Sequence, residues 1–283
     1  MKRCLLLLLA CFALPALAQT LPGDSRLKKI RDAKTVAIAY RTDALPFSFA
    51  DNGQPAGYTV DLCRRVVASL EQQLKVQPLQ VKWVPATSQN RMELVRKGQA
   101  DMECGATTAT LGRMEQVDFS SPVFVDTTGM LVRKGVGTSL EGLAGKKIAV
   151  IAGTTNETAL DAALKKRMVS ATVMRVKNRD EGVAALESGA ADALVSDKLL
   201  LAGLVGKVKD PTQYEILGDD LSFETLAIVL PWNDASLRVA VNRALSQIYS
   251  GDAIVEVFRK NFGPNAVPTP GLIVMYGLSA FPE

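Results

Sequence analysis

Histidine is absent from the 283 residues of this chain. Its absence excludes metal sites built on imidazole, and it excludes the serine–histidine and cysteine–histidine pairs of many nucleophilic enzymes. We therefore expect neither a metal nor a cofactor. The chemistry must come from carboxylates, guanidinium groups, hydroxyls and backbone amides.

A large excess of charge is lacking as well. The formal net charge is +4, and removing Lys2 and Arg3 with the N-terminal segment leaves +2. This excess is small, and the sequence has no runs of basic residues, so we exclude nucleic acid as a partner.

Long apolar runs are missing except at the N-terminus, where residues 5–17 are apolar. This run follows Lys2 and Arg3 and ends at Ala18 after small residues, which is the pattern of a cleaved secretory signal. We assign residues 1–18 to a signal peptide and expect export. An alternative is cleavage before Cys11, which would leave an acylated cysteine, although the apolar segment ahead of Cys11 is short for that purpose.

Cysteine is scarce: of four cysteines, two lie in the signal peptide, and Cys63 and Cys104 remain. An even pair in an exported protein favours a disulfide between them. Two buried free thiols are the alternative.

The mature chain of about 265 residues exceeds the usual size of one hydrophobic core and favours two domains. Apolar and β-branched runs alternate with helical spacing, which predicts an α/β fold with largely parallel sheets covered on both faces. Strands are predicted at residues 35–40, 79–84, 100–104, 129–133, 147–151, 172–176, 193–195 and 223–230. Helices are predicted at 60–74, 88–97 with Ser88 as N-cap, 156–168, 180–188, 198–205 and from 234 onward.

A short internal echo supports two similar lobes. Residues 98–101 and 189–192 both read Gly-x-Ala-Asp after a helix and before a strand. If 129–133 leaves lobe 1 and 223–230 returns to it, two strands form a hinge. The predicted boundaries are 19–131 plus 231–283 for lobe 1 and 132–230 for lobe 2.

Polar residues gather where the predicted strands end. Thr107, Thr108 and Arg113 follow one strand, a Gly-Thr-Thr-Asn segment at 153–156 opens a helix after another, and Asp197 follows a third. Ligands of open α/β sheets sit beyond such strand ends, where helix N-termini offer amides to anions. These groups together suit a zwitterion, with cations and amides for its carboxylate and a carboxylate for its ammonium group.

In this order the motifs identify a resemblance that covers essentially the whole mature chain. The sequence resembles the family-3 periplasmic solute-binding proteins that feed polar amino acids to ABC transporters, and within them the glutamate/aspartate-binding branch. The resemblance rests on Leu45-Pro46-Phe47-Ser48-Phe49, Gly57-Tyr58-Thr59-Val60-Asp61-Leu62, Thr87-Ser88-Gln89-Asn90-Arg91, Glu103-Cys104-Gly105-Ala106-Thr107-Thr108, Asp118-Phe119-Ser120 and Gly153-Thr154-Thr155.

The resemblance implies a type II periplasmic binding protein fold and a monomer in the periplasm that hands an amino acid to a membrane permease without catalysis. It implies Arg113 for the ligand's α-carboxylate, and it implies Arg41 and Arg91 for the side-chain carboxylate. Ala106 stands where the branch shows serine, and Arg179 stands where it shows histidine. The ligand-binding candidates are Arg41, Ser88, Arg91, Thr107, Thr108, Arg113, Thr154, Thr155, Arg179 and Asp197.

Each assignment has a simpler alternative. Arg41, Arg91 and Arg179 could be solvated surface residues, since most arginines are. Arg113 could pair with nearby acidic residues, and Asp197 could merely cap the following helix.

The function also has alternatives. The chain could bind another polar amino acid or a dicarboxylate, or it could serve a chemoreceptor. A periplasmic enzyme related to cyclohexadienyl dehydratase would use Glu103 or Asp126 as acid or base.

Overall fold

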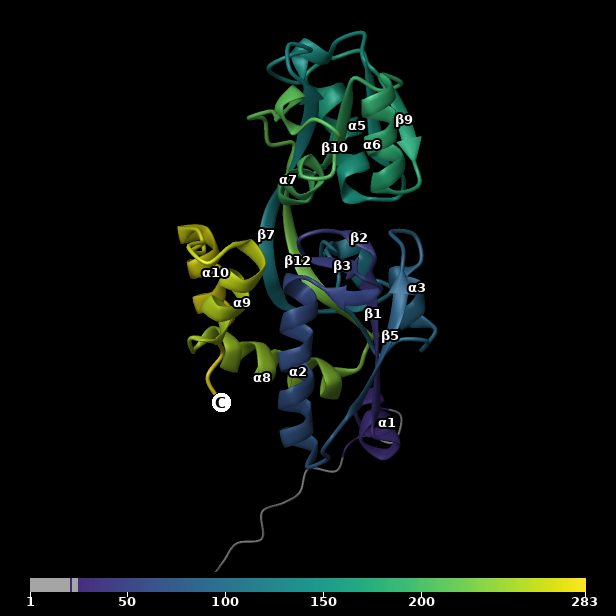
Figure 1. Ribbon diagram of the computed structural model, residues 1–283. Helices are drawn as coiled ribbons and strands as arrows, with labels where there is room; N and C mark the ends of the chain where they lie inside the picture. Colours follow the sequence, from purple (N-terminus) through teal and green to yellow (C-terminus); the bar gives the residue numbers. More distant parts are fainter. Residues whose placement is uncertain (1–20, 22–24) are drawn as a thin grey trace, which may run out of the picture.

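The computed structural model describes residue 21 and residues 25–283 (Figure 1). The signal peptide expected at residues 1–18, with its alternative acylation site, lies outside the described residues. Among the described helices, none is both long and apolar enough to cross a membrane. Two lobes lie one above the other, and two long strands run between them.

Lobe 1 is built around the parallel strand pairs β1–β5 and β1–β6. Its central strand β1 reads TVAIAYR and is almost entirely buried, as its β-branched and apolar composition predicts. The elements of lobe 1 are α1 (Arg26–Ala33), β1 (Thr35–Arg41), β2 (Asp43–Ala44), β3 (Ser48–Asp51), β4 (Gln54–Ala56), α2 (Tyr58–Leu74), β5 (Gln80–Ala86), α3 (Arg91–Arg96), β6 (Met102–Glu103), α4 (Leu111–Met114), α8 (Ala235–Tyr249), α9 (Ala253–Phe262) and α10 (Pro270–Ser279).

The C-terminal helices return to lobe 1 (Figure 1). Leu272 and Tyr276 of α10 belong to the same apolar core as α2 and α8. The Tyr276 hydroxyl lies 2.6 Å from the hydroxyl of Tyr58 on α2. Helix α10 therefore packs on lobe 1.

Lobe 2 repeats the arrangement with the parallel pairs β8–β10 and β8–β9. Its two apolar clusters lie on opposite faces of these strands and are separate from the core of lobe 1. The elements of lobe 2 are β8 (Lys147–Ile151), α5 (Thr155–Lys166), β9 (Thr172–Val176), α6 (Arg179–Ser188), β10 (Ala193–Asp197), α7 (Lys198–Val205) and β11 (Tyr214–Ile216), with 3₁₀ turns at Glu141–Leu143 and Pro211–Gln213.

Strands β7 (Asp118–Arg133) and β12 (Ser222–Leu230) join the lobes as an antiparallel pair (Figure 1). The sequence predicted a strand only at 129–133. The structure extends the strand back to Asp118, and the pairing with β12 shifts register beside Pro122. Such an irregularity accommodates a residue that has no amide hydrogen to donate.

The repeated Gly-x-Ala-Asp segment has the same structural role in both lobes. The Asp101 carboxylate accepts from the Ala37 amide of β1 at 2.7 Å, and the Asp192 carboxylate accepts from the Lys147 amide of β8 at 2.8 Å. Each aspartate thereby fixes the start of the central strand of its lobe. The α/β fold with two similar lobes and a two-strand hinge is confirmed, while the residue boundaries of the lobes stay a prediction.

Candidate ligand-binding site

Four charged side chains from different elements meet between the lobes. Arg41 ends β1, Arg91 begins α3, Arg179 begins α6 and Asp197 ends β10. Each is at most 3% exposed. Arginines on a solvated surface would be exposed, so that alternative is wrong for all three.

Asp43 is a member of this cluster that the sequence did not reveal. Arg41 Nη2 lies 2.5 Å from one carboxylate oxygen of Asp43, and Arg179 Nη1 lies 3.4 Å from the other. Burial disfavours the charged form of Asp43, but the two guanidinium groups hold its pKa below the usual value. Arg41 therefore already has a neutralising partner within the protein.

Arg91 is held by hydrogen bonds to neutral groups. Its Nε donates to the Thr107 hydroxyl at 2.7 Å, and its Nη1 donates to the Ser88 carbonyl. The Thr107 hydroxyl in turn donates to the buried carboxylate of Glu103 at 2.9 Å. Burial lowers the pKa of Arg91. Ser88 is not the N-cap of α3, because the helix begins later, with Asn90 at that position.

Three hydrogen-bond donors of this cluster have no acceptor among the described residues: Arg41 Nε, Arg179 Nε and the Ser88 hydroxyl. All three are buried, and buried donors are nearly always satisfied in proteins. A carboxylate has about four lone-pair positions and can accept from several donors at once. The donor set therefore fits a carboxylate.

A second group of residues surrounds Arg113, on the side of the hinge. Arg113 Nη1 donates to the Thr108 carbonyl at 2.7 Å and makes no ion pair with a described acidic residue. The hydroxyls of Thr108 and Thr155, one from each lobe, donate to Glu224 of β12 at 2.6 and 2.7 Å. Glu224 was missed because its neighbours in the sequence give no sign of its partners.

The Thr154 hydroxyl serves the fold. It is the N-cap of α5, where it accepts from the Glu157 amide and donates to the Ile151 carbonyl at 2.7 Å. Capping by its side chain orients the first turn of α5. The free amides of that turn remain the anion-binding feature at this helix N-terminus.

Asp197 stands at the N-cap of α7, yet its side chain makes no capping hydrogen bond. Asp126 of β7 caps α7 instead, because its carboxylate accepts a hydrogen bond from the Leu199 amide at 3.0 Å. Asp197 instead accepts from the Asn156 amide group at 2.7 Å. The alternative that Asp197 merely caps a helix is wrong.

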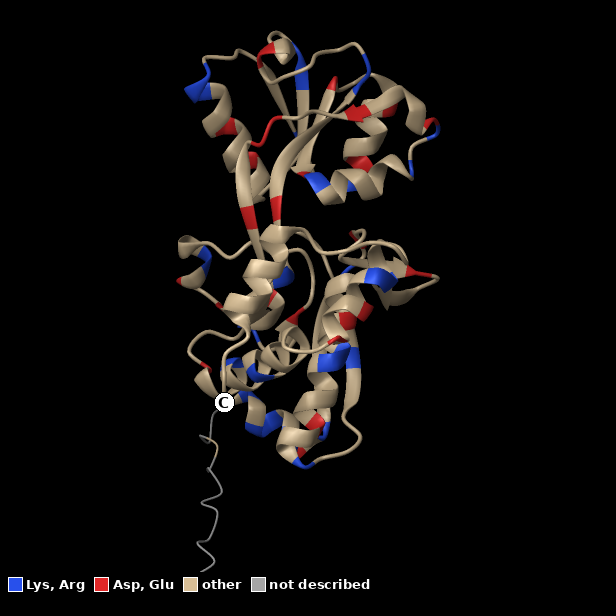
Figure 2. Cartoon of the chain, turned by 90° about the vertical axis from the view of Figure 1, so that its left-hand side faces the viewer, with Lys and Arg blue, Asp and Glu red and all other residues tan. Residues whose placement is uncertain are grey.

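Burial and the neighbouring carboxylate of Asp126 raise the pKa of Asp197 to about 7. Burial raises the pKa of Asp126 to about 6. Figure 2 shows acidic positions on both hinge strands, and Asp126 lies directly opposite Glu224 in their ladder. An ammonium ion next to Asp197 would relieve this concentration of negative charge.

Two cavities lie between the lobes. One of about 700 Å³ is lined by Thr108, Arg113, Thr155 and Glu224. The other, of about 590 Å³, is lined by Asp43, Ser88 and residues of β9 and the start of α6. Both lobes contribute to each cavity. The four buried charged residues of the first cluster line neither of the two, and only Asp43 and Ser88 connect that cluster to the second cavity.

Close contacts hold the lobes together over the site. Gln89 of lobe 1 donates to the Lys177 carbonyl of lobe 2 at 3.0 Å. A Cβ atom on Gly203 of α7 would lie 2.6 Å from the Leu45 carbonyl oxygen, so the backbone of α7 comes close to lobe 1. These contacts and the burial of the charged residues define a closed arrangement.

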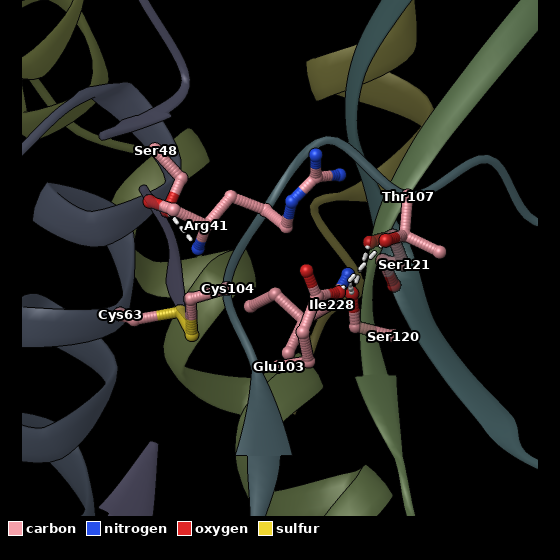
Figure 3. Close-up of a disulfide and its surroundings, with 9 residues drawn as sticks. All are labelled: Arg41, Ser48, Cys63, Glu103, Cys104, Thr107, Ser120, Ser121 and Ile228. Carbon is pink, nitrogen blue, oxygen red and sulfur yellow. Dashed lines mark hydrogen bonds between the residues drawn. A yellow bond between two sulfur atoms is a disulfide. The ribbon is translucent and has the colours of Figure 1, made fainter. Parts of the chain in front are cut away.

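The expected disulfide is present and adjoins the site. Cys104, next to the β6 residue Glu103, is bonded to Cys63 of α2 (Figure 3). Figure 3 shows this bond near Arg41 and Glu103. The bond fixes the end of β6, and with it the segment that carries Thr107 and Thr108.

Comparison with known proteins agrees with this geometry. Residues 36–264 match the bacterial extracellular solute-binding proteins, family 3. The chain is 32% identical over 273 residues to an L-glutamate/L-aspartate-binding protein of Pseudomonas aeruginosa, which covers 95% of this chain and 89% of the relative. It is 34% identical over 259 residues to a glutamate/aspartate import solute-binding protein of Salmonella typhimurium. That alignment covers 91% of this chain and 85% of the relative.

Solved structures share the fold. An ancestral amino acid-binding protein, described as a precursor of cyclohexadienyl dehydratase, matches with a TM-score of 0.73 and 28% identity over 84% of this chain and all of its own. An ancestral arginine-binding protein bound to arginine matches with a TM-score of 0.72 and 27% identity over 81% of this chain and 99% of its own. The chain belongs to family 3 of the bacterial extracellular solute-binding proteins.

Proposed function

We propose that the protein captures an acidic amino acid, glutamate or aspartate, between its lobes in the periplasm and delivers it to an ABC transporter. One observation carries this proposal: three buried arginines and one buried aspartate converge in the cleft, with the partly buried Arg113 beside them. A ligand with two carboxylates and one ammonium group has the complementary charges. The names of the relatives from Pseudomonas and Salmonella support the same ligand class.

Within the proposal, Arg113 and the backbone amides of the first turn of α5 bind the α-carboxylate. Thr108 and Thr155, whose hydroxyls donate to Glu224, line this end of the site. Asp197 binds the α-ammonium group. The side-chain carboxylate lies against the donors of the other cluster. Those donors are Arg41, Ser88, Arg91 and Arg179.

The ligand would contact both lobes, because Arg113 belongs to lobe 1 and Asp197 to lobe 2. Binding to both lobes favours the closed arrangement over an open one, since a ligand shifts a conformational equilibrium by its differential affinity. A membrane permease can then recognise the closed monomer.

Calorimetry with the twenty common amino acids and small dicarboxylates tests the ligand class. We expect heat with glutamate or aspartate, and Arg113→Ala should weaken the affinity by more than tenfold, because breaking a desolvated charge pair costs about 2–5 kcal/mol. The exposed Arg96→Ala is the matched control. A preference for neutral or basic amino acids would refute the proposal.

We further propose that the chain binds its ligand without chemical change. Asp126, a candidate acid or base, accepts from two backbone amides, those of Thr127 and Leu199. These bonds occupy its carboxylate in the hinge and at the start of α7. Incubation with prephenate or arogenate should leave both compounds intact, and a product peak would contradict this part of the proposal.

A further inference from the structure

Glu103 is a buried acid in the wall of the site that the proposed ligand contacts do not use. Its side chain is 0% exposed. One carboxylate oxygen, Oε2, accepts from the Thr107 hydroxyl, while Oε1 has no hydrogen-bond partner among the described residues. A Cβ atom on Gly105 would lie 2.0 Å from Oε1, so the glycine leaves room for this carboxylate.

Three guanidinium groups act on Glu103, those of Arg91 from α3, Arg41 from β1 and Arg113 from α4. Opposite it in the sheet, β12 contributes the neutral residue Val229. Burial outweighs the three cations and raises the pKa of Glu103.

The nearby cations are not equally available to Glu103. Arg41 already pairs with Asp43. Among the acidic groups near Arg113, Glu224 attracts its guanidinium most strongly. Arg91 is linked to Glu103 through the Thr107 hydroxyl that both contact. A ligand carboxylate at Arg91 would therefore share one guanidinium with Glu103.

We propose that Glu103 takes up a proton from solvent when the side-chain carboxylate of an acidic amino acid binds beside Arg91. The ligand carboxylate brings a second negative charge to the guanidinium that is linked to Glu103. Repulsion between the two carboxylates then favours the neutral form of Glu103, whose charged form burial already disfavours. The added proton makes Glu103 neutral and able to donate a hydrogen bond. Capture of an acidic ligand is then coupled to proton uptake. This inference rests on the proposed function.

Asp197 changes the number of bound protons in the opposite direction. A ligand ammonium group stabilises its charged form and releases protons on binding. This release is the same whether residue 103 is Glu or Gln, so a comparison of the two proteins isolates Glu103.

The experiment is calorimetry of L-glutamate and L-aspartate binding to the wild type and to Glu103→Gln, in buffers of different ionisation enthalpy between about pH 5.5 and 8, above the range in which the free ligand protonates. We expect the wild type to take up more protons than Glu103→Gln, by up to about one per ligand. The affinity of the wild type should rise relative to the variant as the pH falls, by at most about tenfold per pH unit. The exposed Glu115→Gln should keep the wild-type proton number.

Equal proton numbers for the wild type and Glu103→Gln would overturn the inference and leave the proposed function standing. Absence of binding of either acidic amino acid to the wild type would overturn the proposed function, and the inference with it. Infrared difference spectra of the wild type give a second measurement that needs no folded variant. A protonated-carboxyl band should appear on addition of glutamate, and its absence would also overturn the inference.

Discussion

Arg179 of lobe 2 donates to the Asp43 carboxylate of lobe 1 across the cleft, at 3.4 Å. The same carboxylate is bound to Arg41. One anion thus serves two buried cations from different lobes. It stabilises the closed arrangement and also occupies part of the positive charge that an acidic ligand would use.

The first prediction concerns Asp43→Asn. Removing one partner of a buried ion pair leaves uncompensated charge, so the free energy of unfolding without ligand should fall by about 3 kcal/mol. Glutamate would then supply a missing anion to Arg41 and Arg179. The rise in melting temperature on adding glutamate should therefore be larger in Asp43→Asn than in the wild type.

The control for that experiment is Asp51→Asn at the exposed end of β3. It should match the wild type in both measurements. An equal ligand-induced rise for Asp43→Asn and the wild type would contradict the shared-anion account.

The second prediction concerns pH. The pKa values of Asp197 and Asp126 are raised to about 7 and about 6 in the folded protein. Both carboxyl groups therefore stay protonated up to a higher pH in the folded state than in the unfolded state. Their contribution to stability is present below about pH 4 and is lost as the pH rises through 6 and 7, at up to about 1.4 kcal/mol per pH unit for each group.

Asp197→Asn cannot ionise, so its stability without ligand should fall less steeply between about pH 4 and 7 than that of the wild type. Urea unfolding at several pH values measures the difference. The exposed Asp161→Asn should keep the wild-type slope, and a wild-type slope in Asp197→Asn would show that Asp197 is ionised throughout.

Local patterns sufficed for much of the fold. The predicted ranges 147–151, 172–176 and 198–205 coincide with β8, β9 and α7, because apolar runs bounded by turn residues define short buried elements. The family resemblance implied the arginines of the site, and the even pair of cysteines in an exported chain favoured the disulfide.

The missed features depend on partners far apart in the chain. Asp43 and Arg179 are 136 residues apart, and Thr108 and Glu224 are 116 apart. No local pattern predicts that an aspartate after a strand will contact an arginine from the other lobe. The start of α3 was misplaced because Ser88 is a good N-cap residue, while the carbonyl of Ser88 is bound instead to Arg91.

The third prediction concerns the disulfide. Cys63 and Cys104 are separated by 41 residues, and closing a loop of that size stabilises by about 4 kcal/mol on the chain-entropy model. Replacing both cysteines by serine should lower the unfolding free energy by roughly that amount. Urea unfolding of the wild type with and without reductant gives the same comparison without mutation, and an unchanged midpoint under reduction would contradict it.

The last prediction tests closure itself at Gly203, in the last turn of α7. An added methyl group would lie 2.6 Å from the Leu45 carbonyl oxygen, a separation that backbone atoms cannot tolerate. The helix alone would gain about 0.5–1 kcal/mol from alanine in place of glycine. Gly203→Ala should therefore hold the lobes apart without weakening α7.

We expect Gly203→Ala to bind glutamate more than tenfold more weakly, since the cost of opening the contact falls on the closed form alone. Its radius of gyration by X-ray scattering should stay larger than that of the wild type at saturating glutamate. Gly206→Ala, at the C-cap of the same helix, is the matched control, because its Cβ would meet only the Gly203 carbonyl at 3.7 Å, an ordinary contact. Wild-type affinity in Gly203→Ala would mean that the two lobes can trap the ligand without bringing α7 against Leu45.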